Sequence, residues 1–209
     1  MPDRIDYNIL VRMLHAAVQQ VRDNHQNLSR LDSFGGDGDH GTTMLRAMEL
    51  LSKTIDSSPK QLPQLLHDIG WAIMGVDGGA AGPLFGTFFM SMSEAAAGKD
   101  SLDIPTLATV FDSALAGVQK RTKAQVGDKT MIDALVPAVR ALRDAPDLAT
   151  ALQNAAAAAQ SGADSTKNFK ARFGRAKNAG DKSIGSPDPG ATSVALIFRG
   201  FYQGFHSHG

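Results

Sequence analysis

Residues 5–21, IDYNILVRMLHAAVQQV, decide the fold class of this chain. Their apolar side chains recur three and four positions apart, which places them on one face of an α-helix. This stripe consists of Ile5, Ile9, Leu10, Met13, Leu14, Ala17, Val18 and Val21. The stretch therefore predicts a long amphipathic helix whose apolar face packs against other elements.

Outward from this stretch, the helical period returns along most of the chain. Further stripes run through residues 44–55, 62–73, 84–92, 107–118, 131–142, 147–160 and 194–201. We expect Pro83 to open one of these helices, because proline is favoured at a first helical position, and we expect the helix from 147 to extend to Phe173. Runs that alternate like a strand are scarce. About eight helices predict an all-α bundle folded as one domain over residues 1–209.

The composition excludes several classes of protein. The 209 residues contain 21 Lys and Arg against 21 Asp and Glu, so electrostatics give no reason to expect a nucleic-acid partner. No segment reaches the roughly 18 apolar residues of a membrane span, and the charged residues 1–6 are unlike a signal peptide. The absence of cysteine excludes disulfides and thiolate chemistry. We therefore expect a cytoplasmic protein that contacts neither nucleic acid nor membrane.

Glycine-rich loops precede several of the predicted helices. Three of them, at 34–41, 78–83 and 188–193, lead straight into a helix, and a fourth lies at 126–130. A helix start offers free N–H groups and a partial positive charge, which suit phosphate groups. These loops therefore indicate a site for a phosphate-bearing ligand.

Three carboxylates crowd the first of these loops. Asp32, Asp37 and Asp39 lie within eight residues of sequence, among flexible glycines. Hard divalent cations such as Mg²⁺ take oxygen ligands of this kind, together with substrate phosphates. The alternative is that these aspartates form turns and cap the following helix. Spacing alone leaves both interpretations open.

Familiar nucleotide and metal motifs do not explain this loop. Residues 36–41 have the GxGxxG spacing of dinucleotide-binding proteins, but no strand precedes them. An EF-hand counted from Asp37 would require glycine where Thr42 stands. Any nucleotide must therefore be bound by another architecture. His40 and one cation of the basic run at 167–177 are candidates for phosphate or metal contacts.

The loops also carry a family resemblance. The chain resembles the nucleotide-binding subunit of dihydroxyacetone kinase, the DhaL family, in motifs that appear in the family's order. These are LD at 31–32, GDGDHG at 36–41, GAAGPLFG at 79–86, VGDKTMID at 126–133, GRA at 174–176, SIG at 183–185 and DPGATS at 188–193. The resemblance implies a closed barrel of eight antiparallel helices with the nucleotide in loops at one end. Ala81 stands where the family commonly has serine.

The resemblance implies roles for individual residues. Asp32, Asp37 and Asp39 match the carboxylates that hold two Mg²⁺ on the phosphates of ADP or ATP, and Arg175 completes the implied catalytic set. The implied nucleotide contacts are His40, Gly41, Thr42, Thr43, Gly79, Ala80, Ala81, Gly127, Thr130, Met131, Arg175, Asp188, Pro189 and Gly190.

The activity implied by the resemblance is phosphoryl transfer from the Mg-bound nucleotide to dihydroxyacetone, or a related short ketose, held on a partner subunit. The chain has no room for a sugar-binding domain, as in the form of the kinase recharged by a phosphohistidine subunit of the phosphoenolpyruvate phosphotransferase system. A transcriptional regulator and a second copy of the chain are further predicted partners. Two alternatives stay open: a non-catalytic, nucleotide-loaded module that docks a transcription factor, and a kinase subunit that exchanges ATP and serves another short sugar.

Overall fold

The computed structural model describes residues 2–143 and 145–207. Over these residues the chain forms eight α-helices, two 3₁₀ segments and two short strands. They are β1 (Ile5–Asp6), α1 (Tyr7–Asp32), α2 (His40–Ser57), α3 (Leu62–Met74), α4 (Ala81–Ala95), β2 (Ser101–Leu102), α5 (Ile104–Arg121), α6 (Ile132–Ala141), α7 (Leu148–Ser165), η1 (Thr166–Asn168), η2 (Arg175–Ser183) and α8 (Pro189–His206). The predicted all-α class is confirmed.

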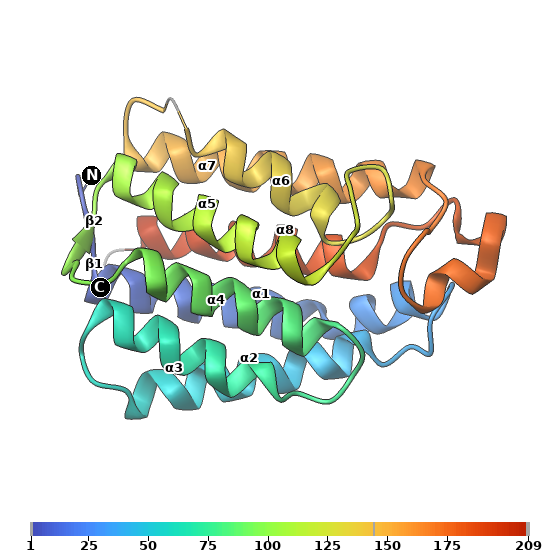
Figure 1. Ribbon diagram of the computed structural model, residues 1–209, viewed down its shortest axis with the longest axis horizontal. Coiled ribbons are helices and arrows are strands. Elements are labelled where there is room, and N and C mark those ends of the chain that lie inside the picture. The colour runs from blue at the N-terminus through green and yellow to red at the C-terminus, as the bar shows by residue number, and fades with distance from the viewer. Residues whose placement is uncertain (1, 144, 208–209) are drawn as a thin grey trace.

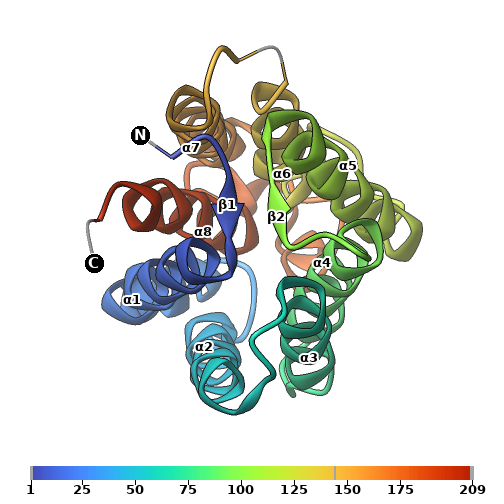
Figure 2. The same ribbon diagram turned by 90° about the vertical axis from the view of Figure 1, so that its left-hand side faces the viewer.

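The helices close into a barrel. Each helix packs against the next along the chain, and α8 returns to pack against α1. Consecutive helices run in opposite directions, so all even-numbered helices begin at the same end of the molecule (Figure 1). Figure 2 looks along the helices and shows the ring that they form. This arrangement is the closed antiparallel barrel that the family resemblance implies.

Close packing of α1 on α8 completes the ring. A Cβ atom at Gly200 would collide with the backbone of Ala17, so glycine is what lets these two helices approach. Inside the barrel, aromatic rings of α4, α5 and α8 pack against one another with centroids 5.3–6.1 Å apart. Cavities among the core side chains measure only about 10 Å³. Among the described residues, side chains therefore fill the interior, and a small-molecule ligand must bind at one end of the barrel.

The helix boundaries differ from the prediction at two places. Helix α7 ends at Ser165 and does not reach Phe173, because the hydroxyls of Ser165 and Thr166 donate to backbone carbonyls of the last turn. Pro83 is the third residue of α4, which begins at Ala81. Proline is tolerated there because the first N–H groups of a helix have no partner within it.

Two further observations complete the fold. The strands β1 and β2 pair antiparallel, with Ile5 opposite Leu102, and join the start of α1 to the α4–α5 connection. Among the described residues, every helix falls short of the length and apolar character that a membrane span requires.

Candidate functional site

The four glycine-rich loops meet at one end of the barrel. Each of them precedes an even-numbered helix, and the even-numbered helices all begin at this end (Figure 1). The positively polarised starts of α2, α4, α6 and α8 therefore surround the same space. That space is a cavity of about 360 Å³, a size typical of small-molecule sites.

Helix starts at the cavity differ from those at the opposite end. At the opposite end Asp6, Asp103 and Asp147 cap α1, α5 and α7 by accepting a hydrogen bond from a backbone N–H group, and only α3 begins there without a side-chain cap among the described helices. At the cavity, the N-cap residues of α2, α4 and α6 make no side-chain capping hydrogen bond, whereas Asp188 caps α8. At two of these starts one N–H group has an acceptor from elsewhere, because Asp32 accepts from the N–H of His40 and the Thr130 hydroxyl accepts from that of Ile132. The other N–H groups of these first turns are available to an anionic ligand.

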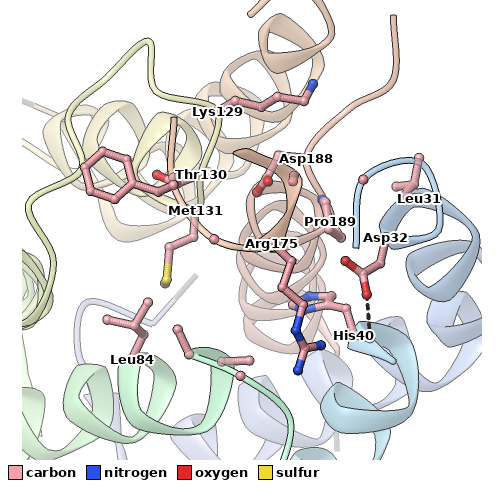
Figure 3. Close-up of a pocket in the computed structure, with 18 of the residues that line it drawn as sticks. Leu31, Asp32, His40, Leu84, Lys129, Thr130, Met131, Arg175, Asp188 and Pro189 are labelled. Atoms are coloured by element: carbon pink, nitrogen blue, oxygen red, sulfur yellow. Dashed lines mark hydrogen bonds between the residues drawn. The ribbon is translucent and has the colours of Figure 1, made fainter. Parts of the chain in front are cut away.

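The three predicted carboxylates come together beside these helix starts. Each of Asp32, Asp37 and Asp39 contributes an oxygen atom, and the three atoms lie within 4.8 Å of one another. Asp39 occupies the N-cap position of α2, but its side chain makes no capping hydrogen bond. Asp32 accepts a hydrogen bond of 3.2 Å from the backbone N–H of His40, drawn as a dashed line in Figure 3. An all-oxygen set of this kind fits a hard divalent cation such as Mg²⁺.

Arg175 reaches this group from the segment after α7. Its guanidinium Nη1 forms ion pairs with Asp37 and, at 3.2 Å, with Asp39. Hydrogen bonds to Asp39 and Asp37 raise the pKa of Arg175. Desolvation acts to raise the pKa of Asp37, but the hydrogen bond and charge of Arg175 outweigh it and hold that pKa below its ordinary value. The predicted catalytic set is thus one connected cluster.

His40 lies between the carboxylates and α8. Its Nε2 atom is 2.9 Å from the hydroxyl of Ser193. Burial lowers the pKa of His40, against the opposing influence of Asp32 and Asp39. The neutral imidazole is therefore the favoured form at neutral pH, and it lines the cavity.

The residues that follow His40 do not line the cavity. A Cβ atom at Gly41 would collide with the backbone of α1 at His25, so this glycine allows α1 and α2 to approach closely. Thr43 is buried, and its hydroxyl donates to the backbone carbonyl of Asp77 at 3.4 Å. Thr42 is exposed. These three residues shape the start of α2, and their predicted contact with a nucleotide stays a prediction.

The remaining predicted nucleotide residues fall into two groups. The cavity is lined by Gly79, Ala80, Ala81, Thr130, Met131, Asp188, Pro189 and Gly190. Gly127 is not part of the lining, and its N–H group donates at 2.5 Å to the buried carboxylate of Asp133. Asp133 also accepts from the N–H of Thr130 at 2.8 Å. One buried carboxylate therefore holds the loop that presents Thr130 and Met131.

Lys129 is a cavity residue that the sequence pattern did not single out. It is buried, and it is the one non-glycine residue with a positive φ, +60°, among the residues described. Its ammonium donates to the backbone carbonyl of Thr166 at 2.7 Å and to that of Ser186. Burial lowers the pKa of Lys129. The signal available in the sequence is the lysine within the family motif VGDKTMID at 126–133.

Asp188 links this lysine to the start of α8. Its carboxylate accepts from the N–H of Ala191 at 2.7 Å, and its own N–H donates to the hydroxyl of Thr166 at 2.7 Å. Desolvation raises the pKa of Asp188 to about 7. Lys129 and Asp188 thus join the 126–131 loop, the end of α7 and the start of α8 into one wall of the cavity (Figure 3).

The part of the cavity lining away from the carboxylate cluster is apolar. It consists of Leu84, Phe85, Met131, Ile132 and Phe173. One end of a bound molecule would meet carboxylates, Arg175 and helix starts, while another part would meet these apolar side chains. Together, the barrel and this cavity define a helical protein built to hold a phosphate-bearing ligand with a divalent cation.

Comparison with known proteins identifies the family. The chain belongs to the DAK2 domain family, whose model matches residues 35–203. It is 39% identical over 199 residues to the ADP-binding subunit DhaL of PEP-dependent dihydroxyacetone kinase 1 from Listeria innocua, covering 95% of this chain and 96% of that protein. It is 40% identical over 180 residues to the corresponding Escherichia coli subunit, covering 82% and 84%. The predicted family resemblance is confirmed.

A solved structure with the same fold carries a ligand. The dihydroxyacetone kinase from C. freundii in complex with AMP-PNP and Mg²⁺ matches with a TM-score of 0.75 and 29% sequence identity. The match covers 94% of this chain and 34% of that one, so this chain spans about a third of the length of the C. freundii kinase.

Proposed function

We propose that this chain is the nucleotide-binding subunit of a dihydroxyacetone kinase. It binds ADP or ATP with two Mg²⁺ and transfers the terminal phosphoryl group to dihydroxyacetone, or a related short ketose, held on a partner subunit. One observation carries the proposal: a cluster of three carboxylates, of which Asp32 and Asp39 line the cavity, lies where the starts of α2, α4, α6 and α8 meet. The DhaL subunits with which it shares 39–40% identity support it.

The cavity suggests how the nucleotide lies. The phosphates belong at the starts of α2, α4 and α8, where backbone N–H groups and helix dipoles favour negative charge. The adenine ring of the nucleotide belongs against Leu84, Met131 and Phe173, which offer an apolar surface for a planar ring. Ala81 has no hydroxyl, so a phosphate there would be held by backbone N–H groups.

The chemistry requires positioning and compensation of charge. Bound Mg²⁺ would neutralise charge on the phosphate oxygens during transfer, held by Asp32, Asp37 and Asp39. The guanidinium of Arg175 can donate to phosphate oxygens and offset charge that develops on them. The base that activates the sugar hydroxyl would come from the subunit that holds the sugar.

The proposal extends to partners and location. We include a dihydroxyacetone-binding subunit and a phosphohistidine subunit that recharges bound ADP, which agrees with the PEP-dependent kinases named among the relatives. A transcriptional regulator and a second copy of this chain stay predicted partners. A cytoplasmic location agrees with a chain that lacks cysteine, and residues 1–209 form one domain in this proposal.

Substitution of the carboxylates tests the proposal. Asp37→Asn and Asp39→Asn each remove a charged oxygen ligand, whereas Asp181→Asn is a matched control because Asp181 pairs with Lys170 outside the cluster. Phosphoryl transfer is measured with a dihydroxyacetone-binding subunit and saturating Mg²⁺. We expect both cluster variants to lose at least the roughly 10- to 100-fold typical of disturbed metal sites, with the control near wild type. Wild-type turnover in either cluster variant would refute the assignment.

A further inference from the structure

The guanidinium of Arg175 pairs with two of the three carboxylates that we propose as ligands of a divalent cation. Its Nη1 atom pairs with both Asp37 and Asp39, and these two carboxylates form the oxygen cluster with Asp32. Figure 3 shows the Arg175 side chain extending toward the start of α2, where His40 lies. The guanidinium of Arg175 is therefore already paired with two of the three carboxylates proposed as metal ligands.

The local backbone directs this side chain to the cluster. Arg175 follows Gly174, whose φ is +65°, and begins the 3₁₀ segment η2. That segment packs closely on the aspartate loop, because a Cβ atom at Gly35 would lie 2.9 Å from the Cβ of Ala176. Two other basic residues of this run pair elsewhere, Lys170 with Asp181 and Arg172 with Asp128. The position of Arg175 at the carboxylate cluster is therefore particular to this residue and is not shared by Lys170 and Arg172.

We propose that Arg175 is an internal counter-ion that competes with the divalent cation for Asp37 and Asp39. This inference rests on the metal site of the proposed function. Without metal, the guanidinium offsets the repulsion among the three carboxylates. When the cation binds, it takes the oxygen atoms that Arg175 occupied, and the released guanidinium is free to bind the phosphates.

The exposure of these groups makes such an exchange feasible. The side chains of Arg175, Asp37 and Asp39 are 53%, 47% and 42% exposed. An ion pair exposed to this degree changes an equilibrium constant by only about 1.4- to 5-fold, so a divalent cation can displace it. Because the phosphates then accept the displaced guanidinium, metal and nucleotide should each strengthen the binding of the other.

Binding of Mn²⁺ to nucleotide-free protein tests this inference without measuring turnover. Free Mn²⁺ is followed by electron paramagnetic resonance during titration of wild type, Arg175→Gln and the matched control Lys170→Gln. We expect Arg175→Gln to bind Mn²⁺ roughly 2- to 25-fold more tightly, the effect of removing two exposed ion pairs of about 1.4- to 5-fold each, and the control to equal wild type. The coupling between Mn²⁺ and ADP should also shrink in Arg175→Gln.

The outcomes separate this inference from the proposed function. Equal or weaker Mn²⁺ binding by Arg175→Gln overturns the role of Arg175 as competitor. Arg175→Lys keeps the positive charge, so it should bind Mn²⁺ less tightly than Arg175→Gln. Because both variants replace the same side chain, a difference between them reports the charge and not a loss of the fold. Asp37→Asn tests the site itself: if it binds Mn²⁺ as tightly as wild type, the metal site is wrong and the proposed function fails with it. If Asp37→Asn loses Mn²⁺ while Arg175→Gln gains nothing, only the inference fails.

Discussion

Asp188 combines two demands that conflict. As the N-cap of α8 it accepts a hydrogen bond from the N–H of Ala191, which favours the ionised carboxylate. It also lines the cavity in which we place nucleotide phosphates, where a negative charge would repel them. Desolvation raises the pKa of Asp188 to about 7, so near neutral pH the cap can carry a proton and its repulsion toward the phosphates falls.

This raised pKa predicts a pH dependence of stability. The folded protein keeps the proton of Asp188 where the unfolded chain has already released it, so the stabilisation is complete below about pH 4 and is lost as the pH rises to about 7. The change is on the order of 1 kcal/mol per pH unit. Asp188→Asn keeps a capping oxygen but does not titrate. Urea unfolding at pH 5, 6, 7 and 8 should therefore show wild type losing stability relative to Asp188→Asn.

A second N-cap aspartate provides the control. Hydrogen bonds from Thr150 hold the pKa of Asp147 below its ordinary value. Its stabilisation is present above the unfolded pKa and is lost only as the pH falls below about 4. Asp147→Asn should therefore run parallel to wild type from pH 5 to 8. If Asp188→Asn also runs parallel, the raised pKa of Asp188 is refuted.

At the scale of elements, the helical period and the glycine-rich loops could be recognised from sequence, because both are local patterns. The residues at which the helices end were harder to predict from sequence. The predicted extension of α7 to Phe173 was wrong. The Thr166 hydroxyl donates to the carbonyl of Ala163 and accepts from the N–H of Asp188, and Asp188 lies more than twenty residues away in sequence. Lys129 escaped notice for the same reason: its acceptors, Thr166 and Ser186, are close only in the folded chain.

Lys129 is expected to hold the cavity wall together. Lys129→Met fits the same space but leaves the buried carbonyls of Thr166 and Ser186 without their donor, at a cost of about 1–3 kcal/mol for each unsatisfied group. We expect a lower melting temperature and weaker binding of Mg·ADP. Lys123→Met, an exposed lysine of the same loop, should stay within about 0.5 kcal/mol of wild type. Calorimetric unfolding and titration of both variants decide the matter, and indistinguishable variants would contradict this role.

At the scale of the whole molecule, the apolar stripes indicate a bundle but do not specify how it closes. Closure depends on contacts between the two ends of the chain, such as Gly200 of α8 against Ala17 of α1, and no local pattern relates them. The family resemblance supplied that relation. The opposite directions of consecutive helices then have a consequence for the site, since the starts of α2, α4, α6 and α8 must lie together.

This convergence predicts that a ligand stabilises the barrel as a unit. A nucleotide bound where these helix starts meet binds the folded state only, so Mg·ADP should add about 4 kcal/mol at a thousandfold excess over its dissociation constant. ADP with EDTA should add less, because the carboxylates of Asp32, Asp37 and Asp39 would then face the phosphates without a cation. Hydrogen exchange should slow at the starts of the even-numbered helices, while the Asp-capped starts of α1, α5 and α7 change only with global stability. Equal melting temperatures with and without Mg·ADP would argue against the site, and uniform protection at both ends would argue against its location at the even-numbered helix starts.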